Sequence, residues 1–467
     1  MFINRQAELA HLNQLYQSAS AHLYVLYGRR RVGKTELLRT FCEGKPHIFF
    51  VATLSSDAEQ LATFSQAIWR FLYGDAPAEF TFPSWEAALQ MLVNLPDRPV
   101  VILDEVTYLI EGNKAIPSIL QKVWDGQLRQ SQIFLVLCGS YVGMMEREIM
   151  SYQAPLYGRR TGGEHLMPLS LPNSALFFPT YSPIEQIEAW AVLGGMTYYL
   201  QIFSDQQDIF ANIRQHILDP RGTLHHEPQL LLMEELREPR NYFSILRAIA
   251  DGRRRLNEIA QGAGISDSRT ASRFLDILRQ LHVVTRETPV TERQPAKSRK
   301  GIYQIGDAFL RFWFSFVHAN QGMLDLGLAE AILNQRVRPG FDQFVSLAFE
   351  EAALAYLAQQ VQQGRLPFLP ERIGRWWIDD EEIDVVAIND AEKVLFVGEC
   401  KWTQRPIGTN ILTDLQRKAH RVIEQEKGWQ IHYGLFAKSG FTPDLQSIAE
   451  KESVLLATPD DLIQTMI

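Results

Sequence analysis

The stretch Gly28-Arg29-Arg30-Arg31-Val32-Gly33-Lys34-Thr35 decides how the first part of this chain folds. It fits the pattern G-x-x-x-x-G-K-[ST] of a phosphate-binding loop and directly follows an apolar run, Leu23 to Tyr27. This order predicts a strand, a loop and a helix. In such a loop the two glycines let backbone N–H groups surround a phosphate chain, Lys34 neutralises the outer phosphates, and the Thr35 hydroxyl helps to hold Mg²⁺. The helix that follows points its positive end at the anion.

A second stretch, Val100-Val101-Ile102-Leu103-Asp104-Glu105, supplies the acids that such a site needs. Its apolar run is typical of a strand that is buried on both faces of a parallel sheet, and it ends in two carboxylates. Asp104 would hold Mg²⁺ through water or Thr35, and Glu105 would polarise the attacking water as a base. The alternative is a glycine-rich turn beside a core strand that happens to end in acids. The two motifs together favour a nucleotide-hydrolysing site.

Length and composition limit the remaining possibilities. A chain of 467 residues is too long for one core and suggests about three domains. The net charge of −8 means that any contact with nucleic acid is local. Cys42, Cys138 and Cys400 lie far apart in or beside apolar runs, which indicates buried thiols in a reducing cytosol. The N-terminus lacks a secretory signal, and no apolar run nears the roughly 18 to 20 residues of a membrane span, so we expect a soluble, cytoplasmic protein without membrane contact.

Strands and helices alternate after the phosphate loop. His47 to Ala52 is predicted as a second strand, and Ser84 to Val93 as a helix that leads into the acidic strand. Ile133 to Leu137 is a further buried strand, followed by Cys138-Gly139-Ser140. This order predicts a doubly wound α/β layer with the ligand at the carboxyl ends of the strands. There the Ser140 hydroxyl either senses the γ-phosphate or is only a polar strand end.

The loop Pro155 to Thr161 carries two adjacent arginines, Arg159 and Arg160. A guanidinium stays ionised and presents a planar fork, which suits the charge on a transferring phosphoryl group. One of the two either reaches the nucleotide of a neighbouring subunit in a homo-oligomer or belongs to an ordinary surface pair; we assign Arg159. The residues expected at the nucleotide are Gly28, Arg29, Arg30, Arg31, Val32, Gly33, Lys34, Thr35, Asp104, Ser140 and Arg159.

Together these motifs resemble a known family. Asn4-Arg5-x-x-Glu8-Leu9, the phosphate loop, Asp104-Glu105, Gly139-Ser140 and Leu156-Tyr157-Gly158-Arg159 resemble the archaeal-type ATPases of prokaryotes, which belong to the AAA+ and STAND-like group of P-loop NTPases. Gly194 to Leu200 looks like the Gly-Gly-x-Pro-x-Tyr-Leu signature of the helical lid in this family, with Thr197 where proline is usual. The resemblance implies that the nucleotide is ATP rather than GTP.

The segment from Asn241 to Phe314 predicts a winged helix-turn-helix. Two apolar helical stripes are followed by a glycine-containing turn and by a third helix from Asp267 to Leu281. Val283 to Arg286 and Gly301 to Ile305 are expected to pair as the wing. The basic residues that would meet DNA phosphates are Arg269, Arg273, Arg279, Arg293, Lys297, Arg299 and Lys300. Alternatively, the domain docks another protein or is a spacer.

A hairpin near the C-terminus carries a second set of acids. Ile383 to Ile388 is predicted as a strand, Asn389 to Glu392 as a turn, and Lys393 to Trp402 as the return strand. If the last residue of the first strand pairs with Lys393, Asp384 lies opposite Val397. In this register the hairpin presents polar residues of both strands on one face.

Glu399 and Lys401 are expected to project on the same side of this hairpin as Asp384, with Cys400 on the other side. Two carboxylates around one divalent ion, with a lysine to position or activate water, are the parts of a hydrolytic phosphodiester site. The alternative is a solvated face in which the acids form a salt bridge with Lys401.

Ile383-Asp384 followed by Gly398-Glu399-Cys400-Lys401 resembles the core of the PD-(D/E)XK nuclease superfamily, with Ile383 where proline is usual. The segment from about residue 315 is similar to the uncharacterised C-terminal domain often fused to archaeal-type ATPases. The resemblance implies that Asp384 and Glu399 hold Mg²⁺, that Glu350 is an accessory acid, and that these three residues and Lys401 cleave a DNA backbone. Loosely matching residues on a later helix are Leu415 and Lys418, and nearby aromatic residues that either stack on bases or belong to the core are Trp376, Trp377 and Trp402.

We therefore expect a multidomain α/β chain. Its parts are a P-loop ATPase core with a doubly wound parallel sheet (1–168), a helical lid (169–237), a winged helix-turn-helix (238–315) and a restriction-endonuclease-like α/β domain (316–467). The protein would hydrolyse ATP and couple nucleotide state to DNA binding and Mg²⁺-dependent DNA cleavage. The alternative is a STAND-like regulatory switch whose nuclease fold does not cut and is a platform for DNA or protein.

Overall fold

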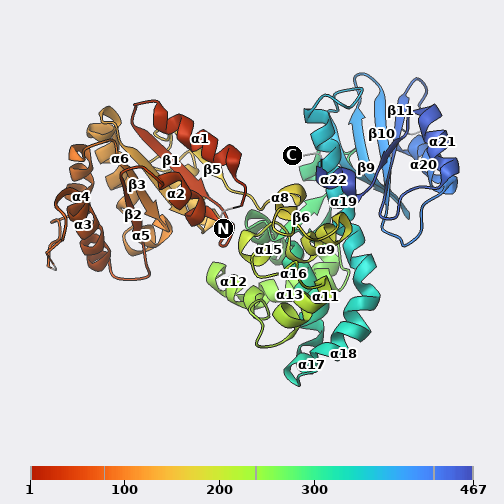
Figure 1. The fold of residues 1–467 in the computed structure, drawn as a ribbon, viewed down its shortest axis with the longest axis horizontal. Coiled ribbons are helices and arrows are strands. Elements are labelled where there is room, and N and C mark those ends of the chain that lie inside the picture. The colour runs from red at the N-terminus through yellow and green to blue at the C-terminus, as the bar shows by residue number, and fades with distance from the viewer. Residues whose placement is uncertain (1–2, 78, 237–238, 424–425, 465–467) are drawn as a thin grey trace. The chain divides into compact units, whose positions relative to one another are not determined.

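The computed structural model (Figure 1) describes residues 3–77, 79–236, 239–423 and 426–464. The chain forms two compact units, of which the first comprises Met1–Pro168 and Met196–Tyr198 and the second comprises Leu169–Gly195 and Tyr199–Ile467. The expected lid thus belongs to the second unit except for three residues around Thr197. The domain boundary expected at 237 and 238 lies outside the described residues.

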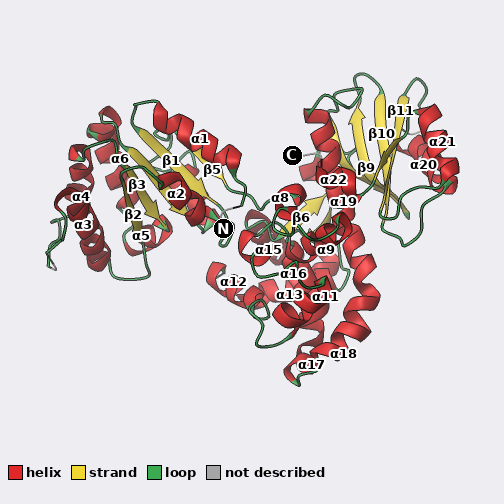
Figure 2. Ribbon diagram, in the orientation of Figure 1, coloured by secondary structure: helices red, strands yellow, loops and turns green. Residues whose placement is uncertain are grey.

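A five-stranded parallel sheet forms the centre of the first unit (Figure 2). Its strand order is β2-β3-β4-β1-β5. The strands are β1 (His22–Tyr27), β2 (His47–Val51), β3 (Val100–Asp104), β4 (Phe134–Gly139) and β5 (Gly162–His165). The apolar runs of β3 and β4 are buried at every position because helices cover both faces. The predicted parallel α/β sheet is confirmed.

Helices pack on both faces of this sheet. One core joins α3, α4, α5 and α6 to the sheet, and on the other face Tyr16 of α1 and Phe41 of α2 contact Phe134 at ring-centroid distances of 6.1 and 5.3 Å. The helical segments are α1 (Gln6–Gln17), α2 (Lys34–Cys42), α3 (Asp57–Tyr73), α4 (Trp85–Met91), η1 (Leu92–Asn94), α5 (Val106–Gly112), α6 (Ile116–Gly126), η2 (Leu128–Gln130), α7 (Val142–Met145) and η3 (Glu146–Met150).

The second unit begins with helices of the expected lid. Proline in the first turn and a capping box between Ser182 and Glu185 start α9. This helix packs against α16 and α19, which come much later in the chain. The segments up to the middle region are α8 (Leu171–Ala175), α9 (Pro183–Leu193), α10 (Thr197–Leu200), α11 (Ile209–Asn212), η4 (Ile213–Leu218) and α12 (Glu227–Glu235).

Three helices and a two-stranded sheet form the middle of the second unit. The elements are α13 (Pro239–Ala250), α14 (Leu256–Gly262), α15 (Ser268–Gln280), β6 (Val284–Glu287), η5 (Pro295–Lys297) and β7 (Ile302–Ile305). The Asp267 carboxylate accepts a hydrogen bond from the Thr270 N–H at 2.9 Å and caps α15. Val284 pairs with Ile305 in an antiparallel pair of strands, so the expected pairing of these two segments is confirmed.

A mixed five-stranded sheet closes the second unit, in the order β12-β11-β10-β9-β8. Its strands are β8 (Arg372–Ile378), β9 (Glu381–Asn389), β10 (Val394–Lys401), β11 (Gln430–Ala437) and β12 (Leu455–Ala457). The helical segments around it are α16 (Ala308–Phe312), η6 (Trp313–Val317), η7 (His318–Asn320), α17 (Gln321–Asp325), α18 (Ala329–Ile332), η8 (Leu333–Val337), α19 (Arg338–Gln362), α20 (Thr409–Val422), α21 (Pro443–Glu452) and α22 (Pro459–Gln464). α19 and α20 both pack on β9 and β10, where the second set of acids lies.

The loop between β6 and β7 packs on the edge strand β8. The Val290 N–H donates to the Arg375 carbonyl at 2.8 Å, and Arg372 NH1 donates to the Val290 carbonyl at 2.8 Å. Val290 is also part of the core of the C-terminal sheet. The base of the expected wing is therefore fixed to the neighbouring sheet. Among the described helices, none has both the length and the apolar character to cross a membrane.

Candidate functional site

The predicted phosphate loop joins β1 to α2, and its key residues converge. Lys34 is 5% exposed, and its Nζ donates to the carbonyl oxygens of Gly28 at 2.9 Å and Arg29 at 3.0 Å. The Thr35 hydroxyl donates to Asp104 Oδ2 at 2.8 Å, which joins the loop to the end of β3. The lysine and both expected magnesium ligands therefore lie at one end of the sheet.

Glu105 and Ser140 meet at the ends of the neighbouring strands β3 and β4. The Ser140 hydroxyl lies 2.7 and 2.6 Å from the two carboxylate oxygens of Glu105 and donates to them, and the Ser140 N–H donates to the same carboxylate at 3.2 Å. Glu105 has a φ of 52°, in the left-handed region, as β3 gives way to α5. The acid expected to polarise water and the hydroxyl expected to sense phosphate are in direct contact.

The arginine side chains of the loop are directed to protein groups. Arg29 is 3% exposed, Arg30 donates to the Tyr108 hydroxyl, and the guanidinium of Arg31 lies 4.7 Å from the centre of the Tyr198 ring. Val32, between them and Gly33, is fully buried. The loop therefore offers a phosphate its backbone N–H groups, while these side chains brace the loop.

Arg159 lies against an acid of its own unit. Its Nε and NH2 are each 2.9 Å from Asp125 Oδ2 of α6, and its side chain is 31% exposed. Action on a second subunit would require this ion pair to open, and that role stays a prediction.

Two contacts to the loop come from distant parts of the sequence. Arg5 NH2 donates to the Val32 carbonyl at 3.3 Å, and the Thr197 hydroxyl donates to the Arg31 carbonyl at 2.9 Å. A Cβ on Gly33, whose φ is 98°, would lie 3.1 Å from Thr197 Oγ1. The sequence marked Thr197 only as a departure from a proline; its hydroxyl, a donor that proline lacks, was the available signal of this contact.

The second candidate site lies on the hairpin formed by β9 and β10, and its expected register is wrong by two residues. Ile388 pairs with Leu395 rather than with Lys393. Lys393 belongs to the connecting loop, where its φ of 53° is left-handed, and Asn389 Oδ1 accepts a hydrogen bond from the Glu392 N–H at 2.9 Å. The loop keeps four residues but lies one residue further along the chain, between Asn389 and Val394, which shifts the pairing register by two.

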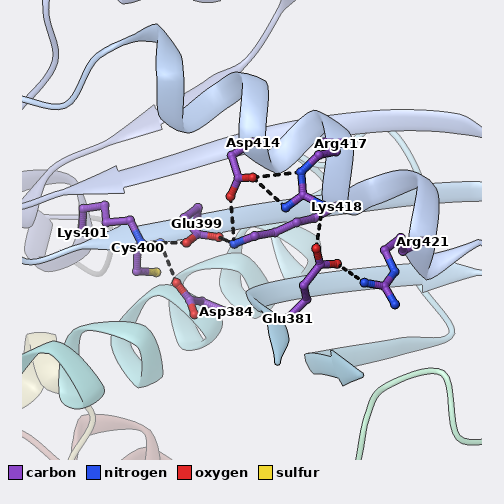
Figure 3. Close-up of polar contacts among 9 residues, drawn as sticks. All are labelled: Glu381, Asp384, Glu399, Cys400, Lys401, Asp414, Arg417, Lys418 and Arg421. Atoms are coloured by element: carbon purple, nitrogen blue, oxygen red, sulfur yellow. Dashed lines mark hydrogen bonds and ion pairs between the residues drawn. The ribbon is translucent and has the colours of Figure 1, made fainter. Parts of the chain in front are cut away.

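A shift of two residues leaves every side chain on its expected face, because the side-chain period of a strand is two. Asp384 Oδ2 accepts a hydrogen bond from the Cys400 N–H at 2.8 Å (Figure 3). Glu399 Oε1 lies 2.7 Å from Lys401 Nζ, and its Oε2 lies 3.4 Å from Lys418 Nζ. Asp384 and Glu399 are each 7% exposed, so both acids are buried beside the two lysines.

The expected accessory acid Glu350, on α19, forms an ion pair with Arg375 of β8 at 2.8 Å. Burial, together with the charge of Asp384, raises the pKa of Glu350 to about 8. Burial and the neighbouring Glu399 raise the pKa of Asp384 to about 6. Burial lowers the pKa of Lys401, but the Glu399 carboxylate outweighs it and the net shift is upward. Glu350 thus lies within electrostatic reach of Asp384, with an arginine partner that sequence patterns did not single out.

An ion-pair network fixes α20 beside this site (Figure 3). Glu381, at the start of β9, accepts from Arg417 at 2.6 Å and from Arg421 at 2.7 Å. Lys418 Nζ also lies 3.3 Å from Asp414 Oδ2. Lys418, matched only loosely from the sequence, is thereby held next to Glu399. The signal in the sequence is the run of basic residues on the polar face of this helix.

Both sites offer oxygen ligands of the kind that magnesium prefers. In the part of the chain that the structure describes, no group of three or more His, Cys, Asp and Glu side chains is close enough to hold a metal ion. Thr35 and Asp104 form one donor pair, and Asp384 and Glu399 form the other. Because Mg²⁺ usually keeps several waters and binds through one or two carboxylates, both pairs fit this ion.

Comparisons with known proteins also separate the part of the chain that carries the nucleotide loop from the part that carries the hairpin. The family described as "ATPase domain predominantly from Archaea" matches residues 2–203, and the family described as "Archaea bacterial proteins of unknown function" matches residues 313–421. An uncharacterised protein of Methanocaldococcus jannaschii is 31% identical over 425 residues, which cover 90% of this chain and 92% of that protein. An uncharacterised ATP-binding protein of the same organism is 51% identical over 45 residues, 10% of this chain and 76% of that protein.

A solved structure shows the same fold. The Walker-type ATPase of Pyrococcus abyssi, 21% identical, matches with a TM-score of 0.50 over 67% of this chain and 96% of its own. With the phosphate loop, the acids of β3 and the parallel sheet, these matches identify an ATP-binding P-loop ATPase fold. The chain belongs to the archaeal-type P-loop ATPases that carry a C-terminal domain of unknown function.

Proposed function

We propose that this ATPase couples its nucleotide state to contact with DNA, and that the hairpin of β9 and β10 cleaves DNA in a Mg²⁺-dependent reaction. One observation carries the cleavage proposal. Two carboxylates, each only 7% exposed, share a face with a lysine whose Nζ lies 2.7 Å from one of them. Acids are buried at such cost chiefly where paired groups or a metal ion compensate them.

At the nucleotide loop, backbone N–H groups and Lys34 would bind the phosphates, with Thr35 and Asp104 as the magnesium ligands. Mg²⁺ held by these residues would supply charge neutralisation at the phosphates. Glu105 would accept the proton of the attacking water, and Ser140, 2.7 Å from that carboxylate, would hold it in position. Arg159 would act on the nucleotide of a second copy of the chain, after release from Asp125.

At the hairpin, Asp384 and Glu399 would hold Mg²⁺, which supplies Lewis-acid polarisation of a phosphodiester when bound. The Cys400 N–H fixes one oxygen of Asp384 at 2.8 Å. Lys401, whose pKa is raised, would stay charged and orient the attacking water or stabilise the negative charge that develops on the phosphate.

The middle region would contact DNA as a winged helix. Arg269 and Arg273 are exposed on α15, whereas Arg279 pairs with Asp276 at 3.2 Å. Because the loop between β6 and β7 is fixed to β8 at Val290, we assign the phosphate contacts to α15 rather than to the base of the wing.

A second candidate function is a STAND-like switch that binds without cutting. The observation that favours it is that the groups of the second site are already engaged with each other. Glu350 is paired with Arg375 at 2.8 Å, and Glu399 lies between Lys401 and Lys418. Such a closed set of ion pairs also suits a site kept for structure or for docking.

The test offers single-stranded, duplex and branched DNA to the purified full chain with Mg²⁺, with and without ATP. Loss of cleavage in Lys401→Ala would support the nuclease, and loss of ATP dependence in Lys34→Ala would show that the nucleotide controls it. Failure to cut any substrate, with ATP turnover intact, would reject the nuclease and leave the regulatory switch.

A further inference from the structure

Two adjoining cavities lie in the second unit between the loop that joins α13 to α14 and the strands β8 and β9. One of about 360 Å³ is lined among others by Arg254, Arg255, Trp377 and Asp384. The other, of about 410 Å³, shares Arg254 and several further residues with it. Both volumes are in the range of ligand sites. The cavities together make a groove that leads to the first acid of the hairpin.

One wall of this groove is basic and comes from Asp251-Gly252-Arg253-Arg254-Arg255, a run that the proposed function does not use. Gly252, at φ 88°, turns the chain after α13. The N–H groups of Arg254 and Arg255 donate to Glu258 Oε2 at 3.3 and 3.1 Å, so their backbone is fixed by α14. Both side chains remain exposed. Among the described residues, the Arg254 guanidinium has neither a hydrogen-bond nor an ion-pair partner.

The opposite wall contains acids, and several of them have arginine partners of their own. Asp379 lies 3.5 Å from Arg421, and Glu381 lies 2.6 Å from Arg417. Glu350 is paired with Arg375. These three acids are thus engaged by other arginines, and no ion pair joins Arg254 to an acid among the described residues. Trp377, half-buried on β8, adds an aromatic surface to the groove.

We propose that this groove binds one unpaired strand of DNA, with its phosphates against Arg254 and Arg255 and a base on Trp377, and so presents a phosphodiester to Asp384. The inference rests on the proposed nuclease and names its substrate class. An exposed guanidinium pair suits a phosphate backbone. An aromatic ring that lines a groove suits a base whose face is free, which a stacked base pair does not offer.

The experiment measures binding by fluorescence anisotropy, with the full chain in EDTA so that no cleavage occurs. The probes are a labelled short oligothymidine and the same strand annealed to its complement. Arg254→Ala/Arg255→Ala should weaken single-strand binding at least about tenfold and reduce the salt slope by about 1.4, since two phosphate contacts are lost. The control Arg240→Ala/Arg247→Ala removes two exposed arginines of α13 that line neither cavity and should leave the affinity unchanged.

Trp377 supplies an independent arm. Trp377→Ala should weaken single-strand binding roughly fivefold or more. Trp377→Phe should retain most of the binding, because a base can stack on either aromatic ring. Equal affinity of the wild type for the duplex would overturn the inference, as would unchanged binding in the arginine double variant. If the wild type cuts DNA and the double variant cuts and binds equally well, the groove is wrong and the nuclease stands. If the double variant loses binding but no protein cuts, the groove stands and the nuclease is wrong.

Discussion

The two candidate sites of this chain differ in how their residues are brought together. At the nucleotide loop, Lys34 reaches the carbonyls of Gly28 and Arg29 within the same short motif. At the hairpin site, two of the acids have partners on separate elements: Glu399 contacts Lys418 of α20, and Glu350 of α19 contacts Arg375 of β8. A contiguous motif carries its geometry with it, whereas a composite site exists only when several elements have packed.

The largest effect is expected at the contiguous site. Lys34→Ala removes the charge that neutralises the phosphates and should lower the rate of ATP hydrolysis by about 100-fold, measured as phosphate release. The matched change Lys401→Ala lies in the other unit and should leave that rate unchanged. A normal rate in Lys34→Ala would mean that the loop is not the hydrolytic site.

A contact between the lid helix α9 and residues far along the chain should make the free energy of unfolding depend on pH. Glu188 of α9 is half-buried and lies 3.6 Å from Lys438, which also pairs with Asp342 of α19 at 2.9 Å. Burial raises the pKa of Glu188 to about 7, above its unfolded value, so the native state binds the extra proton. The stability that this proton contributes is complete below the pKa that Glu188 has in the unfolded chain. It is lost as the pH rises through the folded pKa of about 7.

The stability of Glu188→Gln should therefore not show this fall with rising pH. Between pH 5 and 8 the free energy of unfolding of the wild type should fall by about 1 to 3 kcal/mol relative to the variant, measured by denaturant titration. Glu185, half-buried at the start of the same helix and engaged in its capping box, is the comparison residue, and Glu185→Gln should keep the pH dependence. Parallel pH curves for wild type and Glu188→Gln would contradict the assignment.

Substitution of Lys418 tests whether its positive charge opposes metal binding at the hairpin site. Its ammonium lies 3.4 Å from Glu399 and competes with a divalent ion for that carboxylate. Lys418→Met should tighten Mn²⁺ binding roughly fivefold, or about 1 kcal/mol, measured by calorimetry in a Lys34→Ala background without nucleotide. Lys451→Met, an exposed lysine of α21, is the control. Weaker binding would instead make Lys418 a positioning residue for Glu399.

The smallest effect concerns the contact that reaches the loop from Thr197. Thr197→Val keeps the shape but removes the hydroxyl that donates to the Arg31 carbonyl, and should raise KM for ATP about threefold with little change in kcat. Thr413→Val removes a comparable hydroxyl bond inside α20 and should change neither constant. A change in kcat alone would assign Thr197 to the chemical step rather than to the shape of the loop.

The hairpin shows which features the sequence predicted correctly and which it did not. Alternation along β9 and β10 correctly grouped Asp384, Glu399 and Lys401 on one face. The register was wrong because pairing depends on the turn, and Lys393 took a left-handed conformation inside it. The error did not disperse the site only because it was an even number of residues.

The sequence by itself determined the phosphate loop, the acids at the end of β3, and the parallel sheet, because these depend on short motifs and on apolar runs that can be recognised along the chain. Tertiary structure alone decided that Arg375 engages Glu350, that Lys418 lies beside Glu399, and that Thr197 contacts the nucleotide loop. These contacts join residues far apart in sequence, and no local spacing records which charged side chain becomes the partner of a buried acid. That choice is made when the elements pack and an unpaired buried charge becomes costly.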